Sequence, residues 1–177
     1  VLEVSGDVLK PGSDYVFTAS LLNSVGSGFY RIRKEQINVG PNGGSCKIEP
    51  ATGFALKTEF LASCQGFEDQ DGIDRLYFKL KGADGEIAFP GTSMSEMEFP
   101  VLDVGTFVVE VTIKDQKGAS VTLETNEVTV TQEDVESQDV LLRCNELLDE
   151  AKARNDLTTV LLNLAAVSRA LERVKDE

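Results

Sequence analysis

The sequence predicts a mainly β protein, a two-sheet β-sandwich followed by a C-terminal α-helical hairpin. Between Ser45 and Thr131, short runs that alternate apolar with polar residues recur about every 8 to 15 residues, with no helical pattern between them. After Thr131 the apolar residues recur with a period of about 3.6 instead of about 2, which indicates helices. This change of period separates a β part from a helical part.

The longest strand signal lies near the end of the β part. Residues 107–113 place Phe, Val, Val and Ile on one face, and the turn residues 115–118 follow. The returning strand, 121–130, changes phase at Asn126 and Glu127. Strands of this kind predict an immunoglobulin-like or fibronectin type III-like β-sandwich, without the strand tryptophan of antibody domains, because the chain has no tryptophan.

Residues 1–40 predict two or three strands. A Pro-Gly turn precedes an alternating run in which Tyr15 and Phe17 share a face. This L-x-P-G-x-x-Y-x-F pattern resembles the corner of fibronectin type III modules, where the tyrosine hydroxyl bonds back to the upstream chain. We therefore predict the terminal strands of a preceding fibronectin type III-like module, with the sandwich occupying residues 41–131. A generic surface hairpin with a core tyrosine is the alternative.

Residues 132–177 predict two helices. Apolar residues between Val140 and Ala151 form one stripe, and those between Leu157 and Val174 repeat at alternating spacings of about three and four. Two such helices cannot bury their stripes alone, so we expect them to begin a larger helical subdomain. Cys144 lies on the first stripe, either as a buried free thiol or as the partner of a cysteine outside this chain.

Two cysteines occupy the inward side of neighbouring strand signals. Cys46 is in phase with Ile48, and Cys64 is in phase with Phe60 and Ala62, so both thiols can meet if both strands pack into one core. A bridge closing this loop of roughly 20 residues would stabilise the fold by about 3 kcal/mol. Two free buried cysteines are the alternative, which the spacing alone leaves open.

The same stretch resembles a known family. Gly-Gly-x-Cys at 43–46, Pro-x-x-Gly-x-Ala-Leu-x-Thr-x-Phe at 50–60 and Cys-x-Gly-aromatic-x-Asp-x-Asp at 64–71 occur in fixed order. This order is similar to the receptor-for-egg-jelly (REJ) region of the polycystins and sperm egg-jelly receptors. The aromatic residue there is usually tryptophan, and Phe67 keeps a large apolar side chain without the indole donor.

The resemblance implies a non-enzymatic extracellular segment of a large polycystin-like membrane receptor, outside the plasma or ciliary membrane. Such a segment acts as a spacer and interaction platform, with neighbouring domains of the same chain and an unidentified protein or glycan as partners. The oxidising exterior favours a Cys46–Cys64 disulfide. The resemblance also implies that residues 132–177 open a following autoproteolysis-inducing (GAIN-like) domain. A bacterial surface or periplasmic adhesin with Ig-like repeats and a carbohydrate-binding accessory module are the alternatives.

Composition excludes several classes of function. The net charge of −13 argues against nucleic acid and anionic membranes, because binding there needs clustered Lys and Arg. The chain has no histidine, so it can build no Ser-His-Asp or Cys-His site, and we predict no enzyme and no cofactor. No apolar run of about 18 residues is present, so we expect no membrane contact by this segment, which begins at Val1 like a fragment of a longer protein.

One acidic cluster could attract a hard cation. Residues 68–74 carry four acids but lack the glycine placement and terminal glutamate of an EF-hand loop. We therefore predict no metal site here, but a solvated turn in which Asp side chains cap backbone amides, and calcium binding stays an open alternative.

Overall fold

The computed structural model describes residues 8–83, 85–99, 102–132 and 137–154, together with positions 160, 164, 167 and 168. Within these residues eleven strands precede one helix. In chain order they are β1 (Asp14–Leu22), β2 (Ser27–Gln36), β3 (Ser45–Glu49), β4 (Thr52–Phe54), β5 (Phe60–Gln65), β6 (Ile73–Gly82), β7 (Gly85–Ala88), β8 (Glu96–Phe99), β9 (Gly105–Asp115), β10 (Ser120–Glu124), β11 (Val128–Thr131) and α1 (Ser137–Arg154).

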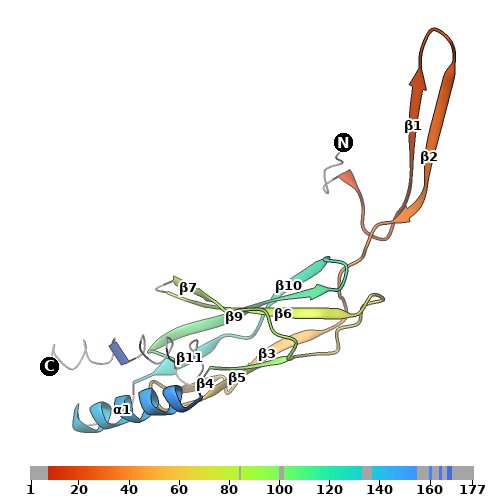
Figure 1. Ribbon diagram of the computed structural model, residues 1–177. Helices are drawn as coiled ribbons and strands as arrows, with labels where there is room; N and C mark the ends of the chain where they lie inside the picture. The colour runs from red at the N-terminus through yellow and green to blue at the C-terminus, as the bar shows by residue number, and fades with distance from the viewer. Residues whose placement is uncertain are drawn as a thin grey trace.

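Strands β3 to β11 form two sheets that face each other (Figure 1). One sheet has the order β3-β5-β8. The other has the order β4-β11-β9-β6-β7, with β10 paired to β9 as well. The chain therefore changes sheets between β3 and β4, where β4 joins the edge of the second sheet parallel to β11. The predicted mainly β sandwich is confirmed.

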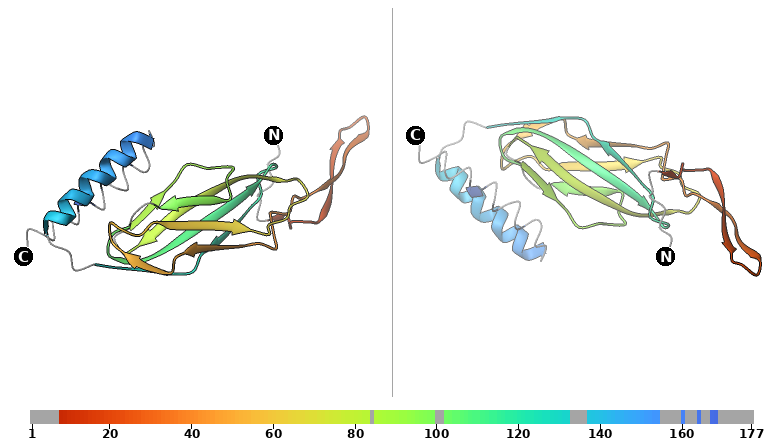
Figure 2. Two further views of the ribbon diagram at one scale, coloured as in Figure 1. Left: turned by 90° about the horizontal axis from the view of Figure 1, so that it is seen from below. Right: turned by 90° about the horizontal axis from the view of Figure 1, so that it is seen from above.

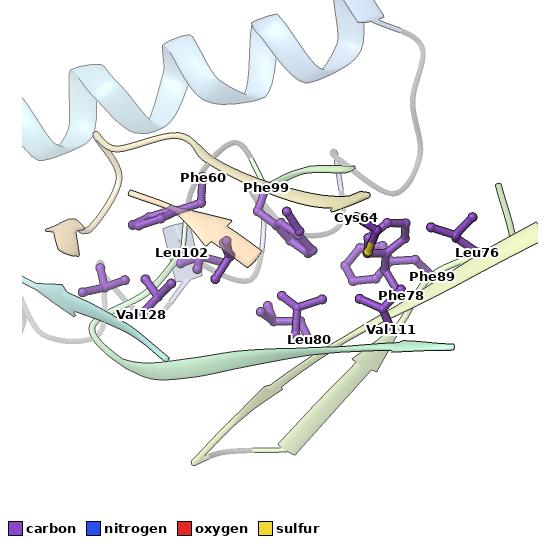
Figure 3. Packing of buried hydrophobic residues seen from close by; sticks show 14 of the residues in the cluster. Phe60, Cys64, Leu76, Phe78, Leu80, Phe89, Phe99, Leu102, Val111 and Val128 are labelled. Atoms are coloured by element: carbon purple, nitrogen blue, oxygen red, sulfur yellow. The ribbon is translucent and has the colours of Figure 1, made fainter. Parts of the chain in front are cut away.

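The core lies between the two sheets and is built mainly from inward residues of β3, β5, β6, β8, β9 and β11 (Figure 3). Phe60, Phe78 and Phe99 are among the largest fully buried side chains, and the ring of Phe99 packs edge-on against Phe89 at 5.4 Å between centroids. On β9, Val109, Val111 and Ile113 are buried, as the alternating pattern predicts. The sequence period thus identified the inward face correctly.

The predicted change of phase near Asn126 is also confirmed. β10 pairs with Glu110–Lys114 of β9, whereas β11 pairs with Gly105–Phe107 of the same strand. Between them, the Thr125 N–H donates to the carbonyl of Val109 at 2.9 Å. The returning segment is therefore one interrupted strand along β9.

The β1–β2 hairpin projects away from the sandwich (Figures 1 and 2). The linker that follows it enters the sandwich at one end, beside the β9–β10 turn, and β11 leaves at the other end (Figure 1). The chain therefore enters and leaves the sandwich at opposite ends of its long axis.

Helix α1 confirms the first predicted helix. The second predicted helix lies outside the described residues apart from four positions, so the helical hairpin is not shown. Among the described residues, no helix combines the length and apolar character needed to cross a bilayer. The predicted domain boundaries at residues 40 and 131 stay predictions.

Candidate functional site

The segment around the two cysteines is the centre of the site. Cys46 and Cys64 face each other across the β3–β5 ladder, with their Cα atoms 4.0 Å apart, and their sulfurs are bonded. The bridge therefore ties two neighbouring strands within one sheet and does not join the two sheets. Cys64 is buried and Cys46 packs against the core, which agrees with the predicted inward phase.

Glycines flank both cysteines because the backbones and one ring approach closely there. Gly43 and Gly66 have φ values of 81° and 75°, a region that favours glycine. Beyond them, Asn42 and Glu68 pair through two backbone hydrogen bonds of 3.1 and 2.9 Å. The ring of Phe67 lies over Gly44, where a Cβ atom would come within 3.0 Å of the ring. The Gly-Gly-x-Cys and Cys-x-Gly-aromatic motifs thus form one unit.

The motif at residues 50–60 builds the crossing between the sheets. In the turn after β4, the Phe54 N–H donates to Thr58 Oγ1 at 2.9 Å, while the Thr58 N–H donates to the Phe54 carbonyl at 3.1 Å. Leu56 is buried with a φ of 59°, an uncommon value for a residue with a side chain. A Cβ at Gly53 would collide with Thr58 and Phe60. These contacts give the motif a structural role in the turn between β4 and β5.

Asn126 joins the two sheets, which the sequence analysis did not predict. Its Oδ1 accepts from the Ile48 N–H, and its Nδ2 donates to the Ile48 carbonyl, both at 3.0 Å. The amide therefore takes the place of a neighbouring strand along the edge of β3. An asparagine at the interruption of a strand was the available signal, but it only indicated the interruption.

The acidic run lies at the entry end of the sandwich. Asp69 and Asp71 come together with Asp115 of the β9–β10 turn, with ligand atoms within 4.8 Å of one another. Asp69 Oδ1 accepts from the Asp71 N–H at 2.7 Å, the amide capping that the sequence predicts. Lys117 Nζ lies 2.7 Å from Asp71, and this hydrogen bond raises the pKa of Lys117. A cation would have to displace that ammonium.

Asp115 connects the linker to the sandwich. Its Oδ1 accepts from the N–H groups of Lys117 and Ala119 at 2.8 and 2.9 Å, and its Oδ2 accepts from Asn38 Nδ2 at 2.6 Å. Burial alone would raise the pKa of Asp115, but the hydrogen bonds from Asn38 and the turn outweigh burial and lower it. One carboxylate therefore closes the turn and holds the linker.

The β1–β2 hairpin contains the predicted tyrosine contact. The Lys10 N–H donates to Tyr15 Oη at 2.9 Å. Other apolar side chains of this hairpin are open to solvent, with Leu21 80% and Phe29 79% exposed. The hydrogen bond expected of the corner is present, but the described residues do not cover these apolar side chains.

The outer face of the larger sheet carries a closed set of ion pairs. Glu110 lies 2.9 Å from Lys79 and 2.6 Å from Lys81, and Lys81 also reaches Glu124 at 3.0 Å. Hydrogen bonds from Lys81 and Lys79 lower the pKa of Glu110, and the bond to Glu110 raises the pKa of Lys81. These lysines and glutamates neutralise one another, so together they do not form a basic surface.

Helix α1 touches the crossing directly. Arg143 Nε donates to the Leu56 carbonyl at 3.1 Å, and Leu147 of the same helix is buried. The helix therefore packs against the turn that follows β4.

Comparison with known proteins identifies the family of this chain. No curated protein matches it. Among solved structures, fibronectin(III)-like modules of Clostridium thermocellum CbhA are 18% identical, with 70% of this chain and 66% of that chain covered and a TM-score of 0.41. CopC from Methylosinus trichosporium OB3b is 17% identical, with 55% and 97% covered and a TM-score of 0.34. This chain spans just under two thirds of the CbhA modules. A family model for the REJ domain matches residues 1–172, nearly the whole chain. The chain belongs to the REJ domain family.

Proposed function

We propose that this chain is a non-enzymatic structural and interaction segment in the extracellular part of a polycystin-like membrane receptor. Membership of the REJ domain family is the observation that carries the proposal. The disulfide fits an oxidising exterior. The motifs at residues 43–46, 50–60 and 64–71 form turns, close packing and the bridge, and the chain offers no histidine for acid-base chemistry.

The β1–β2 hairpin supplies the last two strands of a preceding fibronectin type III-like module in this proposal. The hydrogen bond from Lys10 to Tyr15 Oη supports it, because that contact belongs to the corner of such modules. A two-stranded hairpin is marginal on its own in water, and the exposed Leu21 and Phe29 need a cover. Slow amide exchange of β1 and β2 in the intact receptor is expected, and exchange as fast as in a free hairpin would contradict this assignment.

Surface labelling of intact cells tests the extracellular placement. An epitope inserted beside Ala83, which lies in an exposed turn, marks the segment without touching the core. Antibody should bind cells that express the full-length protein without permeabilisation. Binding only after permeabilisation would refute the proposal. Peptide mapping of the surface-labelled protein should recover Cys46 and Cys64 in one cross-linked pair.

A further inference from the structure

The second strand of the sandwich and its last strand lie side by side and run in the same direction. β4 is among the first strands of the sandwich and β11 is its last, and Thr52–Phe54 pair with Thr129–Thr131 in parallel. The linker enters at one end and β11 leaves at the other (Figure 1). Tension applied to the two ends of the chain therefore pulls β4 and β11 in opposite directions along their length.

We infer that the β4–β11 pair is a load-bearing clamp and that the disulfide limits how far the chain extends after the clamp opens. This inference deepens the proposed structural role and rests on it for its biological meaning. In this geometry the bonds between the strands are sheared together, whereas a hairpin pulled at its open end loses them one at a time. Because these hydrogen bonds must break together, we expect a higher barrier to opening, and forced unfolding is governed by the rate at which that barrier is crossed.

Specific backbone groups form the clamp. The Thr129 N–H donates to the Ala51 carbonyl at 3.0 Å, and the Ala55 N–H donates to the Thr131 carbonyl at 2.9 Å. Val128 and Val130 alternate with these threonines and are buried in the core. Sliding β11 along β4 would therefore break hydrogen bonds and drag buried side chains out of their packing.

The far end of β4 is held in place by the crossing. The reciprocal Phe54–Thr58 hydrogen bonds close the turn that follows β4, and Arg143 binds the carbonyl of Leu56 within it. Arg143 belongs to α1, which follows β11 in the chain, so its bond to Leu56 has to break before tension on the C-terminal end loads β11 against β4.

The disulfide encloses β4 in a covalent loop. Cys46 precedes β4 and Cys64 follows it, with a sequence separation of 18. After the clamp opens, the residues between Cys46 and Cys64 cannot be stretched between the two pulled ends of the chain, because the disulfide carries the load past them. At about 3.4 Å per residue, the loop withholds about 60 Å of extension.

Pulling the chain in two different directions tests the inference without a substitution in any strand. Gly40 packs closely against the backbone of Ser120, so the linker and the β9–β10 turn lie at the same end of the sandwich. A handle at the exposed Gln116 and another at the N-terminal end would therefore peel strands from that end. Handles at the two chain ends would shear β4 against β11.

Single-molecule pulling of the 177-residue chain tests the inference. At one loading rate, the end-to-end geometry should give a higher sandwich unfolding force than the Gln116 geometry. Ala55→Pro removes a clamp donor and should lower the end-to-end force. Ala88→Pro places the same substitution on β7, at the opposite edge of the sheet, and should leave that force unchanged. Replacing both Cys46 and Cys64 by alanine should lengthen the unfolding step by about 60 Å.

Equal forces in the two pulling geometries would overturn the clamp, even if Ala55→Pro failed to fold. An equal loss of force in Ala55→Pro and Ala88→Pro would overturn it as well. An unchanged step length without the cysteines would overturn the role of the disulfide. None of these results bears on cell-surface placement, which the epitope experiment decides separately.

Discussion

Replacing Gly44 by alanine tests why the two glycine-cysteine motifs occur together. Gly44 carries no positive φ restriction, so alanine can adopt its backbone, but the added Cβ would lie within 3.0 Å of the Phe67 ring. Phe67 packs against the core and cannot move away without opening a gap. We therefore expect the substitution to act through packing and not through backbone strain.

The expected magnitude is the difference of two effects. Overpacking of this kind costs about 1–3 kcal/mol. Replacing glycine by alanine at a compatible backbone position stabilises by about 0.4–1 kcal/mol through the unfolded chain. The net loss in the free energy of unfolding should be about 1–2 kcal/mol. For a unit the size of the sandwich, this loss lowers the Tm by roughly 5–15 °C.

A double-mutant cycle supplies the control. In a Phe67→Ala background the ring is absent, so Gly44→Ala should become neutral or stabilising by about 0.4–1 kcal/mol. Guanidinium unfolding of the four proteins measures each step. The reasoning fails if Gly44→Ala is harmless while Phe67 is present, or if it costs the same amount in both backgrounds.

Three further predictions concern other contacts of the sandwich. Asn126→Ala leaves the N–H and the carbonyl of Ile48 without the side-chain amide that binds them. It should lower the free energy of unfolding, measured in urea, by about 1–2 kcal/mol. Asn145→Ala, on the exposed side of α1, is the matched control, and equal losses would contradict the sheet-joining role. Replacing Cys46 and Cys64 together by alanine should cost about 3 kcal/mol, and a loss below about 1 kcal/mol would show that the loop is already restricted in the unfolded chain. Because the pKa of Glu110 is lower in the folded than in the unfolded chain, its contribution is complete above the unfolded pKa and is lost as pH falls through the folded pKa. Urea midpoints between about pH 7 and pH 3 should therefore fall less steeply in Glu110→Gln, and identical slopes would refute this pH dependence.

Individual strands followed from the sequence because their cause is local. Residues 107–113 alternate so regularly that their inward face could be named in advance, and Val109, Val111 and Ile113 are buried as expected. The turn at 115–118 followed from its residue types. The phases of Cys46 and Cys64 were predicted in the same way, and the bridge between them is confirmed.

Contacts between distant segments could not be predicted in this way. Nothing near Asn126 in the sequence names Ile48 as its partner, and nothing near Asp115 names Asn38. The spacing of residues 68–74 likewise gives no indication that Asp115, from another turn, lies beside Asp69 and Asp71. Each of these pairs depends on how the sheets stack and not on local spacing.

The sequence by itself determined the β character of residues 45–131, the inward face of its strands, the inward phase of Cys46 and Cys64 and the family resemblance. These properties depend on side-chain period and motif order, which are written along the chain. Tertiary structure alone decided that the bridge lies within one sheet, that β4 crosses to the other sheet, and that β4 and β11 run in parallel. Strand partners and direction are set when two sheets bury a shared core, because only then do residues far apart in sequence become neighbours.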